Sequence, residues 1–281
     1  MSGLRVRAFQ MADVPTVAVL AGAAFDFDLS EAGAGERWRA RLAHPLATDP
    51  DGAFVAESEG VIVGAAQVIA RERVWCLSLL SVAPAAQSAG AGRALLERAL
   101  AYAPSTDVGL IMSSSDPRAL RLYALAGFSL LPTFEAVGTL DRRALPRPAS
   151  EVRAGDAADL EALEPISREL RGAPHTAEVA FALEMGARLL RLGDRGFAVV
   201  YPRHSVWLLA ARDEPAAVQL LWAALALSET ERPAVRWITG DQQWAIEVVI
   251  RAGLRLSSYG ALCVRGSGGT LRPFLPSGPF A

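Results

Sequence analysis

Apolar positions along the first 140 residues recur at spacings that predict strands alternating with helices. Short apolar runs predict strands at 4–9, 53–57, 61–70, 74–82, 108–114 and 129–140. The Glu59-Gly60 step between the second and third runs predicts a hairpin. Residues 11–25 predict an amphipathic helix, and residues 25–42 predict a loop followed by a second helix. This order predicts an α/β domain with one mixed sheet flanked by helices.

A loop of small residues follows the strand predicted at 74–82. Residues 87–92 read QSAGAG and contain no bulky side chain, so a ligand can approach their backbone amides closely. The helix after the loop carries apolar residues at 95, 96, 99 and 100 on one face. Its first turn offers unpaired N–H groups and the positive end of the helix dipole, which favour an anion such as phosphate. A strand-to-helix turn without a ligand would use the same residues, so the loop alone leaves both interpretations open.

A second segment with a recognisable order of residues lies at 114–132. Asp116 is the predicted N-cap of a short helix, Pro117 takes its first helical position, and Gly127 ends it. The helix carries Tyr123 in its last turn.

Together the two segments resemble the motifs of the GNAT superfamily of N-acetyltransferases. The first motif, Gln/Arg-x-x-Gly-x-Gly/Ala preceded by Val-x-Pro, is matched by Val82, Pro84, Gln87, Gly90 and Gly92. The second motif, Asn-x-x-Ala-x-x-Leu-Tyr-x-x-x-Gly-Phe, is matched by Ala119, Leu122, Tyr123, Gly127 and Phe128, with Asp116 in place of the commoner Asn. Two linked motifs in the right order favour the superfamily over a chance match.

The chain also repeats itself after a charged, proline-containing linker at 141–150. The pattern V-R-A-x-x-x-A-D occurs at 6–13 and again at 152–159, and the spacing from Ala119 to Gly127 recurs from Ala245 to Gly253. We therefore expect two tandem GNAT-like domains, 1–144 and 150–281. Each is expected to be a mixed, mostly antiparallel twisted sheet flanked by helices.

The second copy is expected to be degenerate. It has no glycine between Gly196 and Gly240, and Asp213 and Glu214 stand where a pyrophosphate would lie and would repel it. Val249 takes the position that corresponds to Tyr123. This copy is expected to pack on the first as a second subunit does in GNAT dimers, so the protein is predicted to be a pseudo-dimeric monomer or a homodimer.

The resemblance implies that acetyl-CoA is the co-substrate and that a primary amine of an unidentified small molecule or peptide attacks it directly in a ternary complex. It implies that the pantetheine pairs with the backbone near Leu80, Val82 and Ala83. It also implies cofactor contacts at Gln87, Ser88, Ala89, Gly90, Ala91, Gly92, Arg93 and Asp116. Tyr123 is the implied general acid, because a phenol can protonate the thiolate leaving group. The alternative is a non-catalytic acetyl-CoA sensor or a scaffold.

The general base stays open. The strand before the loop offers Ser78 and Ser81, neither of which is a competent base alone. Asp26, Asp28 and Glu31 lie in the region that forms one wall of the acceptor site in the resembled family, where they could bind a cationic substrate or form a solvated helix face. His44 fits a loop cap better than a base, and His175 fits a helix start better than a group that projects into an acceptor cleft.

Composition narrows the function further. The net charge of −2 gives no reason to expect a nucleic-acid partner, and all 28 basic residues are arginine, which excludes a catalytic lysine. The two cysteines, Cys76 and Cys263, lie in apolar runs without a CxxC partner, so we expect buried free thiols and no metal. No signal peptide or membrane-spanning run is evident, and a cytoplasmic protein is predicted.

The last residues form a separate feature. A flexible Ser-Gly stretch precedes an apolar segment stiffened by proline, which carries Phe274, Leu275 and Phe280. A frayed terminus and a tail docked on a cleft are both open; exposure of three large apolar side chains would be costly in water, which favours docking.

Overall fold

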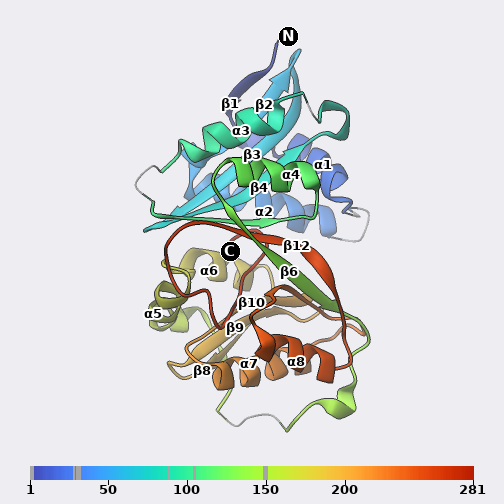
Figure 1. Ribbon diagram of the computed structural model, residues 1–281, viewed down its shortest axis with the longest axis vertical. Coiled ribbons are helices and arrows are strands. Elements are labelled where there is room, and N and C mark those ends of the chain that lie inside the picture. Colours follow the sequence, from blue (N-terminus) through green and yellow to red (C-terminus); the bar gives the residue numbers. More distant parts are fainter. Residues whose placement is uncertain (1–2, 28, 30–32, 88, 104–105, 148–150) are drawn as a thin grey trace. The chain divides into compact units, whose positions relative to one another are not determined.

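The computed structural model describes residues 3–27, 29, 33–87, 89–103, 106–147 and 151–281, and its contacts divide the chain into two compact units. Unit 1 contains residues 1–70 and 75–106, and unit 2 contains residues 71–74 and 107–281 (Figure 1). Both units are mostly antiparallel sheets flanked by helices, as the sequence predicts.

Unit 1 is built on four strands in sequential order. Its elements are β1 (Arg5–Ala8), α1 (Val14–Phe25), α2 (Ala34–Thr48), β2 (Ala53–Ser58), β3 (Val61–Arg71), β4 (Val74–Val82), the 3-10 turn η3 (Pro84–Ala86) and α3 (Ala91–Leu100). Strands β1, β2 and β3 pair antiparallel, and β4 follows β3 in the sheet. Helices α1 and α2 pack their apolar faces on the sheet around Val17, Leu42 and Val55.

Unit 2 contains the remaining elements. They are β5 (Val108–Ser113), α4 (Pro117–Leu125), β6 (Ser129–Val137), β7 (Arg153–Gly155), α5 (Leu160–Leu170), α6 (Thr176–Glu184), β8 (Arg188–Leu192), β9 (Gly196–Tyr201), β10 (Ser205–Ala211), α7 (Glu214–Ala226), β11 (Ala234–Thr239), α8 (Gln243–Arg251), β12 (Arg255–Gly266) and β13 (Phe274–Leu275). The strand order in this unit is β5-β12-β6-β11-β10-β9-β8-β7, and β13 pairs with β10.

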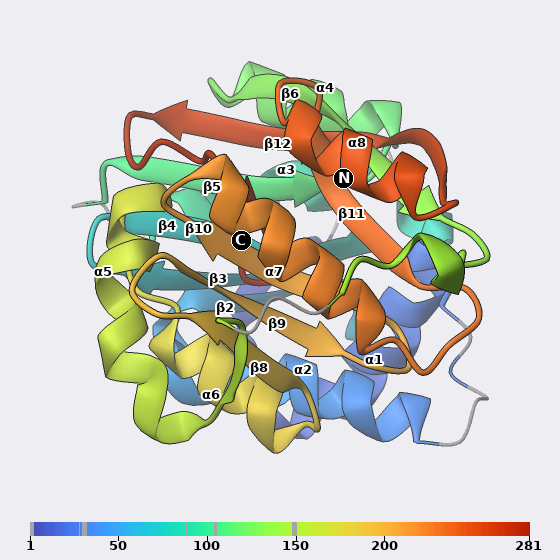
Figure 2. The same cartoon turned by 90° about the horizontal axis from the view of Figure 1, so that it is seen from below.

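Apolar side chains alternate between the two faces of strands β8 to β10, as the two-residue period of a strand requires. Leu189, Val199 and Leu208 belong to the core under α5 and α6. Their neighbours Leu190, Val200 and Leu209 belong to the core under α7 and α8. Figure 2 shows α7 and α8 on the same face of these strands. Both faces of the sheet are therefore covered.

The strands of the two predicted copies interleave in unit 2. Strand β12 lies between β5 and β6, where Leu262 pairs with Met112 on one side and Leu131 on the other. Strand β6 in turn lies between β12 and β11, with Ala136 opposite Val235. The strand predicted at 129–140 is present as β6, but β12 separates it from β5. The compact units therefore do not follow the predicted boundaries at 144 and 150, which remain a prediction about the sequence copies.

The internal repeat is present as a repeat of elements. The succession strand, helix, strand, helix, strand occurs as β4, α3, β5, α4 and β6, and again as β10, α7, β11, α8 and β12. Helices α4 and α8 each end before a glycine in the left-handed region, Gly127 at φ 85° and Gly253 at φ 84°. These matching ends confirm the relation that the glycine spacing indicated.

Two local predictions need correction. The second helix runs from Ala34 to Thr48 and so extends beyond residue 42. His44 lies inside this helix, so its interpretation as a loop cap is wrong. Pro45 is tolerated in the last turn of the helix, where it directs the chain into the turn before β2. Cys76 and Cys263 are buried free thiols, as expected.

Candidate functional site

The predicted anion loop in unit 1 joins the end of β4 to the first turn of α3. Ala83 donates its N–H to the Val63 oxygen at 2.8 Å, which ties the strand end to β3. The Gln87 side chain folds back and donates from Nε2 to the Val82 oxygen at 3.2 Å. Gly64 lies where an added Cβ would come within 2.9 Å of the Ser81 oxygen, so β3 and β4 approach closely here. The loop is thus held at its strand end and open at its helix end.

Gly90 is the N-cap residue of α3 and adopts φ 92°, ψ −8°. A Cβ at this position would meet nothing within 4 Å, so the left-handed backbone alone favours glycine here. Gly90 itself has no side chain to cap the helix, so this residue leaves the first-turn N–H groups of α3 open to a ligand. Arg93 is exposed and pairs with Glu97 at 2.8 Å, which raises the pKa of its guanidinium through that hydrogen bond. The first turn of α3 therefore carries a cation and no carboxylate.

The equivalent helix of the second copy, α7, is capped by its own side chain. Asp213 accepts a hydrogen bond from the Ala216 N–H at 2.8 Å and forms an ion pair with Arg195 at 2.6 Å. The hydrogen bond from Arg195 holds the pKa of this carboxyl below its usual range. Because the carboxylate already occupies the helix N-terminus, an added phosphate would meet both repulsion and a satisfied donor. The N-termini of α3 and α7 therefore differ in how they are capped.

The second motif lies in unit 2 and forms the predicted helix. Asp116 is the N-cap of α4 and accepts a hydrogen bond from the Arg118 N–H at 2.8 Å. A side-chain hydrogen bond from Arg118 lowers the pKa of Asp116. Pro117 takes the first helical position, as expected. Asp in place of Asn thus retains the capping role.

Tyr123 is buried in the last turn of α4 and is 4% exposed. Its ring contacts Phe128 edge to face, with 6.5 Å between the centroids. Desolvation raises the pKa of the phenol well above 10, with smaller contributions from Cys263 and Asp116. The hydroxyl therefore stays protonated at neutral pH, which is the state that a proton donor needs. Val249, its counterpart on α8, is fully buried.

The predicted site residues divide between the two units. Unit 1 holds Asp26 and, around the loop, Leu80, Val82, Ala83, Gln87, Ala89, Gly90, Ala91, Gly92 and Arg93, whereas Asp116 and Tyr123 belong to unit 2. Ser88, Asp28 and Glu31 lie outside the described residues. Asp26 is exposed and ends α1 in the left-handed region at φ 54°.

The segment between α1 and α2 is aromatic as well as acidic. Phe27 packs edge to face on Trp38 at 5.0 Å between ring centroids. The Arg41 guanidinium lies 5.0 Å above the Trp38 ring and donates to the oxygen of Ser78. Desolvation lowers the pKa of Arg41 to about 10. Sequence reasoning missed this cluster, although the spacing of Trp38 and Arg41 on one helix face would have indicated it.

Two buried polar groups of unit 1 were also missed or left without a role. Gln67 on β3 is fully buried and donates from Nε2 to the Leu42 oxygen at 2.7 Å, but its Oε1 has no partner among the described residues. The Ser81 hydroxyl is likewise buried without a partner in the described part of the chain. Buried polar atoms of this kind are normally satisfied by protein, water or a ligand. In contrast, the Ser78 hydroxyl lies 3.2 Å from Arg41, so it is engaged.

Among the described residues, no group of three His, Cys, Asp or Glu side chains is arranged to hold a metal ion. Within the same residues, every helix is too short or too polar to span a bilayer.

Comparisons with known proteins found a matching family model and solved structures of the same fold. Residues 22–128 match the model of the acetyltransferase (GNAT) family. No curated protein matches the chain. A proposed acetyltransferase from Pyrococcus horikoshii superposes with a TM-score of 0.84 at 18% identity, covering 100% of this chain and 97% of that one.

Two further solved structures have the same fold. A GCN5-related N-acetyltransferase from Sphaerobacter thermophilus gives a TM-score of 0.59 at 19% identity and covers 95% of this chain and 96% of its own. A tandem GNAT protein from the clavulanic acid biosynthesis pathway gives 0.60 at 18% identity and covers 95% and 99%. At such identities the likeness shows the fold, and it extends over both copies.

Proposed function

We propose that this chain, whose residues 22–128 match the model of the acetyltransferase (GNAT) family, is an acyltransferase that transfers an acetyl group from acetyl-CoA to a primary amine. The acceptor is a small molecule or a peptide, and its amine attacks the thioester directly while both substrates are bound. The observation that carries this proposal is the open N-terminus of α3 at Gly90, set against the self-capped N-terminus of α7 at Asp213.

The residues around the loop fit acetyl-CoA. The pyrophosphate would take N–H groups from Gln87 to Arg93, and the backbone of Leu80, Val82 and Ala83 would hold the pantetheine arm. A Cβ added at Gly90 meets no atom within 4 Å, which leaves room for a phosphate there. The chain thus offers several neutral donors and one guanidinium to a highly anionic ligand.

In the transfer itself a C–N bond forms and the C–S bond of the thioester breaks. The attacking amine must be neutral, and it gives up a proton after attack. Tyr123 supplies a proton to the departing thiolate, because a phenol is protonated at neutral pH even at its ordinary pKa of about 10. Asp116 serves the site by starting α4, the helix that carries Tyr123. The base that receives the proton of the amine is not assigned to a residue.

The second candidate function is an acetyl-CoA sensor without turnover. It is favoured by the lack of a carboxylate on β4 at the loop end, where the chain offers Ser78 and Ser81. Ser78 is engaged by Arg41, so it is unsuited to accept a proton. An enzyme and a sensor share the binding step and differ in release of free coenzyme A.

Calorimetric titration with acetyl-CoA, followed by a thiol-release assay with a panel of amines, tests both functions. We expect one acetyl-CoA per chain and thiol release that depends on an amine. Binding without thiol release for any amine would favour the sensor. An absence of binding would overturn both proposals, and two sites per chain would show that the second copy is intact.

The setting of this reaction is also a proposal. Buried free thiols at Cys76 and Cys263 fit a reducing compartment, the cytoplasm. A single chain with two copies would act as a pseudo-dimeric monomer or would form a homodimer; sedimentation of the purified protein distinguishes these. Aspartates in the acceptor wall, Asp26 and Asp28, would attract a cationic amine.

A further inference from the structure

The last residues of the chain follow a defined path through unit 2. The path begins at Gly269, where an added Cβ would lie 2.2 Å from the backbone of Leu170 at the end of α5. Leu271 then donates its N–H to the Leu170 oxygen at 2.8 Å. The backbone at Gly269 therefore lies so close to the end of α5 that only glycine fits at this position.

Beyond Leu271 the tail joins the sheet as strand β13. Strands β10 and β11 pair in parallel at Ser205 and Val206. Farther along β10, Leu209 and Ala210 pair with Leu275 and Phe274 of the tail in antiparallel register. Addition of an extended segment to a strand edge is a common way for a protein to hold a peptide.

Gln242, which lies just before α8, forms hydrogen bonds with the backbone of strand β13. Its Nε2 donates to the Phe274 oxygen at 2.6 Å, and its Oε1 accepts from the Phe274 N–H at 2.9 Å. This pair of bonds satisfies both polar groups of one tail residue from a side chain that is only 2% exposed. Because both hydrogen bonds go to backbone atoms, this clamp by Gln242 binds an extended segment whatever side chain that residue carries.

The end of the tail inserts an aromatic anchor. Phe280 is 1% exposed, and its ring packs edge to face on Phe181 of α6 and Trp207 of β10, with centroids 6.1 Å and 5.9 Å away. A turn closed by Ser277 brings Phe280 to this place, because the Ser277 hydroxyl accepts from the Phe280 N–H at 3.1 Å. The Phe280 side chain is therefore buried against two aromatic rings.

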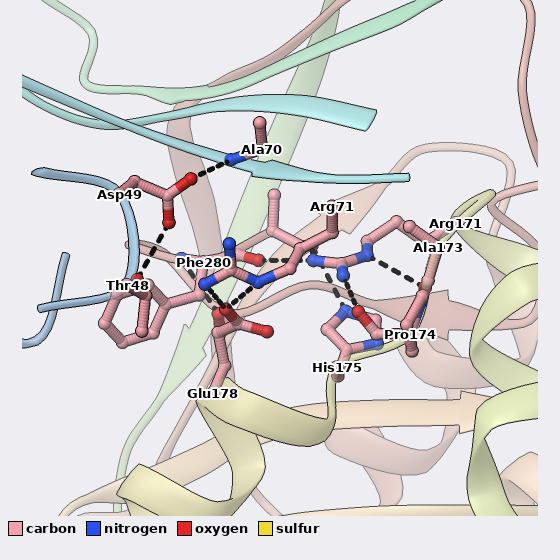
Figure 3. Close-up of polar contacts among 12 residues, drawn as sticks. Thr48, Asp49, Ala70, Arg71, Arg171, Ala173, Pro174, His175, Glu178 and Phe280 are labelled. Carbon is pink, nitrogen blue, oxygen red and sulfur yellow. Dashed lines mark hydrogen bonds and ion pairs between the residues drawn. The ribbon is translucent and has the colours of Figure 1, made fainter. Parts of the chain in front are cut away.

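A fully buried arginine holds the tail's last oxygens (Figure 3). Arg171 donates from Nη1 to the Phe280 oxygen at 2.9 Å and to the Ala281 oxygen at 2.8 Å. His175 places Nε2 3.2 Å from the Ala281 oxygen and Nδ1 3.0 Å from the Ser167 hydroxyl. Desolvation, with the neighbouring Arg171 charge, holds the pKa of His175 well below 6.5, so the ring is neutral. Such donors, buried together, form a site for backbone oxygens.

From these contacts we propose that the second copy is a peptide-binding module whose groove takes an extended segment with an aromatic anchor, and that residues 273–281 of this chain are its ligand. The strand edge of β10 and the Gln242 clamp bind the backbone. The Phe181 and Trp207 pocket binds the aromatic side chain, and Arg171 holds the last oxygens. This assignment is independent of the acetyl transfer proposed for the first copy.

The groove is built for a peptide and not for a second coenzyme. The adjoining helix α7 is capped by Asp213, which excludes a phosphate from its N-terminus. Release of the tail is therefore expected to open a site for a peptide without opening one for acetyl-CoA.

Peptide binding in trans tests the proposal on the full chain. In the wild-type protein the tethered tail competes at an effective concentration of roughly millimolar, so an added peptide binds weakly. The Phe280→Ala variant weakens the tail and should bind a fluorescent peptide of residues 270–281 at least 100-fold more tightly than the wild-type chain does. A peptide with alanine at the position of Phe280 should bind that variant at least tenfold more weakly. Arg272→Gln is the matched control, since Arg272 is in the tail but its side chain is 63% exposed and pairs with Asp241 at the surface.

Hydrogen exchange on the wild-type protein provides a second readout that needs no variant. A bound ligand leaves while its site stays folded, so the amides of Phe274 and Leu275 should exchange faster than those of β9 and β10 but at least 100-fold slower than in a free peptide. Protection equal to that of β10 would overturn the proposal, because the tail would then unfold only with the sheet. Unprotected exchange would also overturn it.

The remaining outcomes are decisive as well. Equal peptide affinity for wild-type and Phe280→Ala chains, or a released tail with no peptide binding, would refute the groove. Phe280→Ala should bind the same number of acetyl-CoA molecules as the wild-type chain. Binding of one additional acetyl-CoA by the variant would show that the tail covers a coenzyme site and not a peptide site. This conclusion does not depend on whether the first copy binds acetyl-CoA.

Discussion

A single aspartate at position 90 should remove the coenzyme site while sparing the fold. Gly90 is the N-cap of α3, where no side chain now caps the helix. Gly90→Asp would give α3 the residue type that caps α7 at Asp213. The pyrophosphate of the coenzyme and the new carboxylate would then compete for the same N–H groups at the start of α3.

The expected loss of affinity follows from the geometry. Two unit charges about 4 Å apart repel by about 1 kcal/mol in water and by about 4 kcal/mol at the effective dielectric constant of a protein surface. At about 1.4 kcal/mol per tenfold change, the Kd for acetyl-CoA should rise about 5- to 700-fold. Relative to Gly90→Ala, which bears the same backbone cost, the carboxylate should stabilise the helix N-terminus by about 0.3–1 kcal/mol, so between these two variants affinity and stability should move in opposite directions.

Gly90→Ala is the matched control for the backbone. A Cβ there meets no atom within 4 Å, so the variant bears only the cost of an L-residue at φ 92°, about 1–2 kcal/mol of folding stability. Its affinity for acetyl-CoA should stay within about threefold of the wild-type value. Calorimetry and urea denaturation measure the two quantities. Equal affinities for the Asp and Ala variants, or an Asp effect that is unchanged by added salt, would refute an anion site at this helix end.

Three further predictions concern single side chains. Tyr123→Phe should lower turnover by about 10²–10⁴-fold and leave acetyl-CoA affinity nearly unchanged, because only the proton donor is lost; an equal loss of affinity in calorimetry would assign the residue to packing. Asp213→Ala removes the α7 cap and should cost about 1 kcal/mol in urea denaturation without creating a second acetyl-CoA site; a stability equal to wild type would show that the cap contributes nothing. The pKa of His175 is depressed in the folded state, so protons bind the unfolded chain preferentially below its usual pKa of 6.5. Stability should therefore fall by about 1.4 kcal/mol per pH unit as the pH drops below about 6.5, and His175→Gln should lose that slope; identical slopes would show that the histidine is not buried neutral.

Local sequence patterns predicted the features that local physics controls. The glycines of the loop, the Asp116-Pro117 helix start and the glycine after α4 each impose a backbone conformation through their own chemistry. The same holds for the hairpin at Glu59-Gly60, where Gly60 has φ 79°. The absence of a capping side chain at Gly90 could likewise be read from the sequence. These positions account for most of the candidate coenzyme site.

Long-range pairings could not be read in this way. The order of apolar and polar residues in β12 does not indicate that this strand lies between β5 and β6. Such a pattern determines which face of a strand is buried, but it does not determine which strands pair with it. Arg171 and Gln242 were missed for the same reason, since their partners are tail residues distant in sequence. The apolar residues of the tail favoured docking, and the docked strand β13 confirms it.

The interleaved strands also constrain when the protein can fold during synthesis. Strand β5 ends at Ser113, but its neighbour β12 begins only at Arg255. At a translation rate of about 5–20 residues per second, β5 and β6 emerge from the ribosome many seconds before the strand that joins them. During that interval an open edge of β5 is available to chaperones or to another nascent chain. A gene that ends at the linker would produce this state permanently, so the first copy expressed alone should aggregate even though all of its sequence motifs are present.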